Sequence, residues 1–212
     1  MILERAAVPP FYKNGFAIGC EETREGVIVD PGDEVEALLD AAARQRLSIV
    51  HILLTHAHLD HVTGVDRARQ ALGAPVWLHE ADKPLYEGVV EQGRMFGLAV
   101  ESQSPVDRFY QPEGALRFGR YRVRILHTPG HCSGGVCLVV TKDTEEPATL
   151  FVGDTLFAGS IGRTDLPGGD MPTLLRSIRD VLFRFPDDTI VWPGHGPQTT
   201  IGEERRTNPF LL

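Results

Sequence analysis

Four short apolar runs of the chain end in the same way, and this repeated ending limits the folds that the sequence can adopt. Each run is followed within a few residues by histidine or aspartate, in the segments LLTHAHLDH, ILHTPGH, LFVGDT and IVWPGHG. Short apolar runs bounded by glycine or proline are typical of buried strands. Ionisable side chains at the ends of such strands lie where sites form in layered α/β proteins. The sequence therefore predicts an α/β protein with a polar site at its strand ends.

The rest of the chain alternates strands and helices. NGFAIGCEE and GVIVDPG predict two paired strands that end at a Pro31–Gly32 turn, with Asp33 capping the helix that follows. Residues 62–72 predict a helix closed by Gly73, whereas residues 81–97 predict an irregular helical stretch because they contain one proline and two glycines.

After residue 110 consecutive strands dominate, followed by a helix predicted over residues 171–183 and a last strand in TIVWPGHG. Strands with attached helices in both halves favour two mixed sheets packed face to face with helices outside, an αβ/βα four-layer sandwich. We expect one domain over residues 1–212, made of two packed halves with a boundary near residue 110.

Composition excludes several classes of protein. The formal net charge is −8, which gives no footprint for nucleic acid or an anionic membrane. No apolar run approaches the roughly 18 residues of a membrane span, and the N-terminus lacks the pattern of a signal peptide. Three cysteines form no disulfide framework. We expect a cytoplasmic monomer or homodimer that acts on a small molecule.

The segment LLTHAHLDH crowds His56, His58, Asp60 and His61 into six positions. Residues two apart share a face of a strand, and residues three or four apart share a face of a helix. A turn that joins a strand to a helix can therefore direct all four side chains into one pocket. The alternative is that Asp60 caps the helix and the histidines are merely exposed.

Three further candidates end the other apolar runs: His131, Asp154 and His195. Nitrogen and carboxylate ligands without thiolate suit zinc, manganese or iron. Seven ligands exceed one closed four-ligand site and divide into two clusters that share a carboxylate. The sequence thus predicts two divalent cations, with zinc as the first choice, in a site that attracts an anionic substrate.

With these motifs assembled, the chain resembles the metallo-β-lactamase fold superfamily over nearly its whole length. The likeness rests on Asp30, on the HxHxDH motif at residues 56–61, and on His131, Asp154 and His195 in the family order. It implies one metal on His56, His58 and His131, and a second on Asp60, His61 and His195, with Asp154 bridging. It also implies that Asp60 orients the attacking water. Asp30 would support the ligand loop, or would instead cap the turn before Pro31.

Within the superfamily, GDTLF, GSIGRTDLPGGD, PGHGP and EERRTNPFL resemble the glyoxalase II (hydroxyacylglutathione hydrolase) branch, in its short bacterial form. The likeness implies hydrolysis of S-D-lactoylglutathione, a glutathione thioester, to D-lactate and glutathione. The chain departs from longer members because it stops at Leu212, so we expect no helical C-terminal glutathione-binding domain. Arg163 stands where those enzymes bind the glutathione carboxylate, and it either clamps an anion or pairs with Asp165.

Other activities remain as alternatives. Persulfide dioxygenases share a similar GRTD segment and hold one iron on residues that match His56, His131 and Asp154, but they lack the PGHG form of the last motif. A β-lactamase or lactonase fits the segment after Asp154 less well, and a nuclease would need an added domain. The complete ligand set disfavours a metal-free binding module. Di-iron electron-transfer proteins usually carry Glu where this chain has His58.

Overall fold

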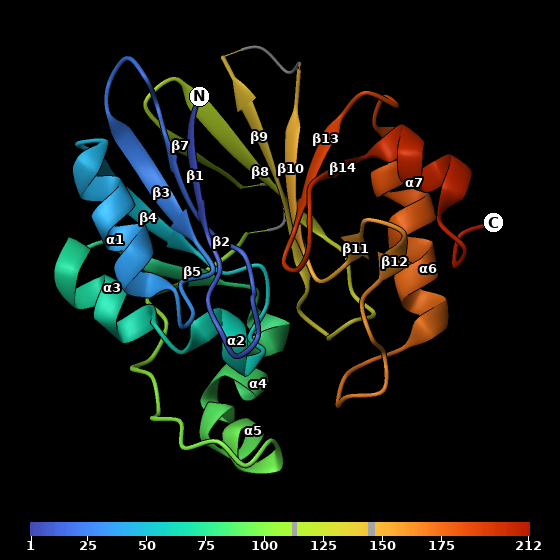
Figure 1. Ribbon diagram of the computed structural model, residues 1–212, viewed down its shortest axis with the longest axis horizontal. Coiled ribbons are helices and arrows are strands. Elements are labelled where there is room, and N and C mark those ends of the chain that lie inside the picture. The colour runs from blue at the N-terminus through green and yellow to red at the C-terminus, as the bar shows by residue number, and fades with distance from the viewer. Residues whose placement is uncertain (112–113, 144–146) are drawn as a thin grey trace. The chain divides into compact units, whose positions relative to one another are not determined.

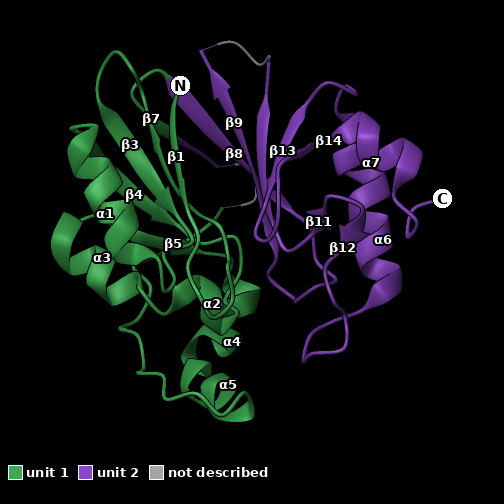
Figure 2. Cartoon of the chain, viewed as in Figure 1, with its two compact units in different colours: residues 1–111, 117–120 green, residues 112–116, 121–212 purple. Residues whose placement is uncertain are grey.

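The computed structural model describes residues 1–111, 114–143 and 147–212, and these residues form two compact units (Figure 1, Figure 2). Unit 1 comprises residues 1–111 and 117–120, and unit 2 comprises residues 112–116 and 121–212. Each unit contains one mixed β-sheet with helices attached to it.

The sheet of unit 1 has six strands in the order of the sequence. They are β1 (Ile2–Ala6), β2 (Gly15–Gly19), β3 (Glu25–Val29), β4 (Ser48–Leu53), β5 (Val76–Leu78) and β6 (Arg108–Phe109). The first three strands pair antiparallel, which confirms the predicted pairing of β2 with β3. The strands from β3 to β6 pair parallel. Since parallel strands end at one edge of a sheet, the residues that follow β3 and β4 come together.

The helices of unit 1 lie between its parallel strands in the chain. They are α1 (Val35–Arg44), α2 (Leu59–Val62), α3 (Val65–Leu72), a 3-10 turn (Glu80–Asp82), α4 (Lys83–Glu87) and α5 (Val89–Met95). Helical spacing predicts that Val35, Leu38, Leu39 and Ala42 share the apolar face of α1. The buried residues are Val35, Leu38, Ala41 and Ala42, while Leu39 is partly buried. These residues and the central strands form the apolar core of the unit.

Two local predictions for unit 1 need correction. Asp33 does not cap α1, because the capping position is Glu34 and Asp33 instead accepts a hydrogen bond from the Thr63 hydroxyl. The helix predicted over residues 62–72 is interrupted at Thr63 and Gly64, so it forms α2 and α3. Gly73 ends α3 in the left-handed conformation as predicted, with φ of +65°.

The main sheet of unit 2 has the strand order β14-β13-β10-β9-β8-β7, and the boundary between the units falls within β7. Its strands are β7 (Ala115–Phe118), β8 (Tyr121–His127), β9 (Val136–Lys142), β10 (Thr149–Gly153), β13 (Ile190–Pro193) and β14 (Thr199–Thr200). β10 pairs parallel with β13 and antiparallel with β9. A separate hairpin, β11 (Leu156–Phe157) and β12 (Ser160–Ile161), follows β10.

Two α-helices belong to unit 2, α6 (Met171–Asp180) and α7 (Ile201–Thr207), with a 3-10 turn (Leu182–Arg184) between them in the chain. The carboxylate of Asp170 caps α6 by accepting the Thr173 N–H at 2.9 Å, which lowers the pKa of Asp170. The sequence predictions missed β1 and α7. The Thr200 hydroxyl caps α7 by accepting the Glu203 N–H at 3.2 Å.

The predicted α/β class, with two mixed sheets and helices, is confirmed. Packing of the two sheets into a four-layer sandwich stays a prediction. None of the described helices is long and apolar enough to cross a bilayer.

Candidate metal centre

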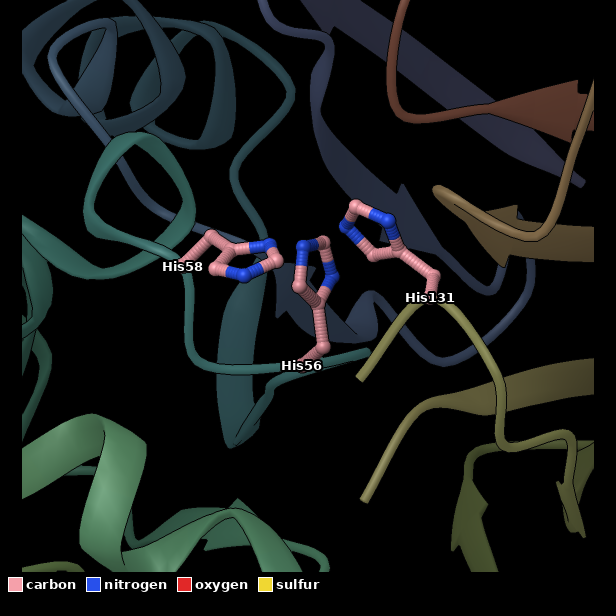
Figure 3. A group of neighbouring side chains, drawn as sticks. All are labelled: His56, His58 and His131. Atoms are coloured by element: carbon pink, nitrogen blue, oxygen red, sulfur yellow. The ribbon is translucent and has the colours of Figure 1, made fainter. Parts of the chain in front are cut away.

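Unit 1 carries the four residues of the histidine-rich segment on the loop that leaves β4 and on α2. His56, His58 and His61 are buried, with exposed fractions of 1%, 8% and 0%. His56 offers a ligand nitrogen within 4.8 Å of one on His58 and of one on His61. Figure 3 shows the rings of His56 and His58 side by side, and their centroids lie 4.9 Å apart. An Asp60 carboxylate oxygen lies 3.8 Å from Nε2 of His61.

A buried carboxylate, Asp30, lies behind this loop at the end of β3. One oxygen accepts the Thr55 N–H at 2.6 Å. The other accepts the Thr55 hydroxyl at 2.6 Å and contacts Nδ1 of His61 at 3.0 Å. The side chain therefore faces Thr55 and His61.

These contacts determine which nitrogen of two histidines carries the proton. A carboxylate accepts, so Nδ1 of His61 is the protonated nitrogen and its Nε2 bears the lone pair. The Thr55 hydroxyl gives its one proton to Asp30, so it accepts from Nδ1 of His56 at 3.2 Å. Asp30 thus orients His61 directly and His56 through Thr55.

The irregular segment after β5 holds the backbone of the same loop. The buried carboxylate of Asp82 accepts the Ala57 N–H at 3.0 Å. The amide of Gln92 accepts the Leu59 N–H at 3.0 Å and donates to the Ala57 carbonyl at 3.1 Å. The loop that carries His56 and His58 is therefore fixed from both sides of Ala57.

Glycine allows a second loop to approach this one. A side chain at Gly32 would place its Cβ 1.9 Å from the Asp60 carbonyl oxygen. The turn after Asp30 can therefore lie directly against α2 only because it has glycine at this position.

Unit 2 carries the other three predicted ligands. His131 lies between β8 and β9, where Figure 3 draws its side chain, while Asp154 follows β10 and His195 follows β13. One oxygen of Asp154 lies 3.6 Å from Nε2 of His131 and 3.7 Å from Nε2 of His195. Parallel pairing of β10 with β13 brings the last two residues to one edge.

A backbone carbonyl orients His131. Its Nδ1 lies 2.7 Å from the carbonyl oxygen of Arg163. Since a carbonyl only accepts, Nδ1 of His131 carries the proton and Nε2 bears the lone pair. The segment after Asp154 therefore returns to hold another ligand of the same unit.

The guanidinium of Arg163 pairs with Asp165 through two contacts of 2.7 Å. This pairing lowers the pKa of Asp165 to about 2 and raises that of Arg163. Of the two predicted roles, the ion pair is present, and a clamp for an anion stays a prediction.

The C-terminal helix anchors the hairpin that follows Asp154. The buried carboxylate of Glu204 accepts the Gly159 N–H at 2.9 Å and the Thr199 hydroxyl at 2.6 Å. Asn208 donates to the Ser160 carbonyl at 3.0 Å and also to Glu204 at 2.7 Å. The EERRTNPFL segment therefore holds the hairpin of unit 2 in place through Glu204 and Asn208.

Sequence reasoning missed Thr55, Asp82, Gln92 and Glu204 as supporting residues. Each acts on a partner that lies far away in the chain, or through a hydroxyl or amide that has no distinctive pattern. Only the position of Thr55, directly before His56, gave a local signal.

The comparisons with known proteins identify the family of the chain. The metallo-beta-lactamase superfamily matches residues 9–195. The chain is 40% identical to the hydroxyacylglutathione hydrolase GloC of Haemophilus influenzae, over 100% of this chain and 98% of that protein.

Solved structures with the same fold are found as well. The BLEG-1 B3 metallo-beta-lactamase superposes with a TM-score of 0.89 and 38% identity over 100% of both chains. TTHA1623 in a di-iron-bound form gives a TM-score of 0.86 and 42% identity, over 98% of this chain and 100% of that one. The two mixed sheets with their helices match the fold of these proteins, and the chain belongs to the metallo-β-lactamase superfamily.

Proposed function

We propose that the chain is a metal-dependent hydrolase that cleaves a thioester, and that ligands from both units hold two divalent cations. The observation that carries this proposal is that three candidate ligands share one tautomer. In His56, His61 and His131, Nδ1 donates its proton to an oxygen partner, so the lone pair that can bind a metal is on Nε2. Ligating histidines are oriented in this way by carboxylates, carbonyls and other acceptors behind them.

The donor set fits divalent cations. Imidazole nitrogens and carboxylates without thiolate accept zinc, manganese and iron. Two ligands that are each about 2.1 Å from one tetrahedral ion lie roughly 3.4 Å apart. The contacts of Asp154 with His131 and His195, at 3.6 and 3.7 Å, are close to that spacing.

The proposed assignment of ligands follows the family pattern, with zinc as the first choice of metal. One cation would be held by His56, His58 and His131, the other by Asp60, His61 and His195, and Asp154 would contact both. When bound, the cations would lower the pKa of a bound water to about 7 and so supply hydroxide at neutral pH.

The residues of this chain would position that water and the substrate. Asp60 has a carboxylate with 13% of its side chain exposed, so it can accept a hydrogen bond from the attacking water and orient it. The two aspartates carry −2 against the +4 of two cations, which leaves a site that attracts an anionic thioester and stabilises an oxyanion. Arg163 would approach the carboxylate of the substrate if its pairing with Asp165 opened.

S-D-lactoylglutathione is the proposed substrate. The chain covers 98% of a relative that is named a hydroxyacylglutathione hydrolase, at 40% identity. All three cysteines are buried thiols, which suits a reducing compartment. We therefore propose a cytoplasmic monomer or homodimer that acts on this small molecule.

The test is hydrolysis of S-D-lactoylglutathione by protein that has been stripped with a chelator and reloaded with zinc, manganese or iron. Release of free thiol with kcat/KM above about 10⁴ M⁻¹s⁻¹ would support the thioesterase. Asp154→Asn should abolish this turnover, while Asp180→Asn, at an exposed position at the end of α6, serves as the matched control in the same unit.

The same preparations distinguish the alternatives. Iron-dependent oxygen consumption with glutathione persulfide would favour the dioxygenase, for which the di-iron form of TTHA1623 shows only that a similar chain accepts iron. Hydrolysis of a β-lactam in place of the thioester would favour the activity named for BLEG-1. Absence of thioester turnover with every metal would overturn the glutathione assignment.

A further inference from the structure

Asp30 has a backbone conformation that is uncommon for a residue with a side chain. Its φ is +49°, in the left-handed region that favours glycine. Its N–H donates to the Leu53 carbonyl at 3.0 Å, and its carboxylate engages Thr55 and His61. Something must hold the chain in this conformation, because any relaxation of φ would turn the carboxylate away from both partners.

A buried ion pair contacts this turn from the side opposite the carboxylate. The ammonium of Lys13 donates to the Asp30 carbonyl oxygen and to the carboxylate of Glu34. The same Glu34 oxygen accepts the Gly32 N–H at 3.0 Å. Lys13 and Glu34 are 1% and 2% exposed, so the pair that closes the turn from Asp30 to Glu34 is shielded from bulk solvent.

The fold makes room for this pair by having glycine in the neighbouring strand. A Cβ at Gly15 would lie 2.2 Å from a carboxylate oxygen of Glu34, so β2 carries glycine where the pair lies. On its other side the turn contacts the ligand loop, because the Gly64 N–H donates to the Pro31 carbonyl at 3.0 Å. The turn is therefore held between the ion pair and α2.

Stability alone does not explain such a pair. Desolvation of two charges commonly cancels their attraction, and apolar residues of similar size stabilise a core equally well. An apolar pair, however, could not donate to the Asp30 carbonyl or accept from Gly32. Lys13 also balances the charge of Glu34.

We infer that Lys13 and Glu34 are a positioning pair for the metal centre. They hold the Asp30 carbonyl, which keeps the carboxylate on Thr55 and His61 and so sets the direction of Nε2 in His56 and His61. This inference rests on the proposed function, in which those two histidines bind metal. Lys13 and Glu34 act through Asp30 and touch neither the metal nor the substrate.

The test compares Lys13→Met/Glu34→Gln with a matched pair in the same unit. Arg67 and Glu36 form an exposed ion pair with a contact of 2.5 Å, and Glu36 lies two residues beyond Glu34. The control is therefore Arg67→Met/Glu36→Gln. Two readouts are needed: the zinc Kd from competition with a chelator, and the imidazole Nδ1–H resonances of His56 and His61 in metal-free protein.

The expected result is a zinc Kd raised about 10- to 100-fold, the range for residues that orient ligands, with both resonances shifted. The control should keep both readouts unchanged. Unchanged resonances and Kd in the Lys13/Glu34 variant would overturn the inference while the proposed function stands. If wild-type protein binds no zinc, the proposed function fails, and the resonances alone then decide whether the pair orients the histidines. Glu34→Gln alone, which keeps the size of the side chain, is read in the same way if the double variant does not fold.

Discussion

Replacing Thr55 with valine tests whether Asp30 acts on His56 through the intervening hydroxyl. Valine keeps the shape of the side chain but removes the hydroxyl that donates to Asp30 at 2.6 Å and accepts from His56 at 3.2 Å. In the variant the Asp30 carboxylate still accepts from the backbone N–H of residue 55 and from Nδ1 of His61, so its charge stays hydrogen-bonded. Two hydrogen bonds are therefore lost without a new buried charge.

The expected loss differs between metal-free and metal-bound protein. A hydrogen bond to a charged group contributes about 1.5–3 kcal/mol, so metal-free Thr55→Val should lose about that much stability. His56 can then move its proton to Nε2. Metal at Nε2 forbids this shift and leaves Nδ1–H buried without an acceptor, which costs roughly 1–3 kcal/mol more. Zinc affinity should therefore fall by about 10- to 100-fold, as for other residues behind ligands.

Urea unfolding of the metal-free protein measures the first loss, and chelator competition measures the second. A loss of 2 kcal/mol should also lower the Tm by about 4–8 °C for a chain of this size. Thr63→Val is the matched control, because its hydroxyl donates to the exposed Asp33 carboxylate at 2.8 Å. If Thr55→Val keeps both wild-type stability and wild-type zinc affinity, the proposal that Asp30 orients His56 through the Thr55 hydroxyl is wrong.

Three further predictions concern single side chains. Asp154→Asn should lower the metal content of purified protein to less than about half, measured by elemental analysis, because the carboxylate beside two imidazoles loses its charge; full retention would contradict its role as a ligand. Burial raises the pKa of Cys137 to about 11, so its thiol should resist a disulfide reagent at about pH 8 until the protein unfolds. Burial lowers the pKa of His51, so the stability that it contributes is present above the ordinary histidine value of about 6.5 and is lost as pH falls. His51→Gln should weaken the pH dependence of the free energy of unfolding in urea between about pH 7.5 and 5.5 and leave metal content unchanged. An equally steep pH dependence in the variant would show that other groups cause it.

The strand ends that carry the candidate ligands could be predicted because their signal is local. Each short apolar run is buried, and the ionisable residue directly after it lies at a sheet edge, as for Asp154 after β10 and His195 after β13. Chain order is enough to place such residues within their own unit. The α/β class follows from the same alternation of strands and helices.

The supporting contacts could not be predicted because they depend on the tertiary fold. Asp82 and Gln92 contact the backbone of Ala57 from positions 25 and 35 residues further along the chain. The predicted cap at Asp33 was wrong for a related reason. Glu34 occupies the capping position, while the Asp33 carboxylate is engaged by Thr63 from a different helix.

The two units hold their histidines by chemically different means, and this difference bears on how each can change in evolution. In unit 1 the acceptors behind the imidazoles are side chains, on Asp30 and Thr55. In unit 2 the acceptor behind His131 is the backbone carbonyl of Arg163, which any amino acid would provide. Position 163 can therefore change its exposed side chain while the acceptor behind His131 is kept. Positions 30 and 55 have no such freedom, because their side chains are themselves the acceptors.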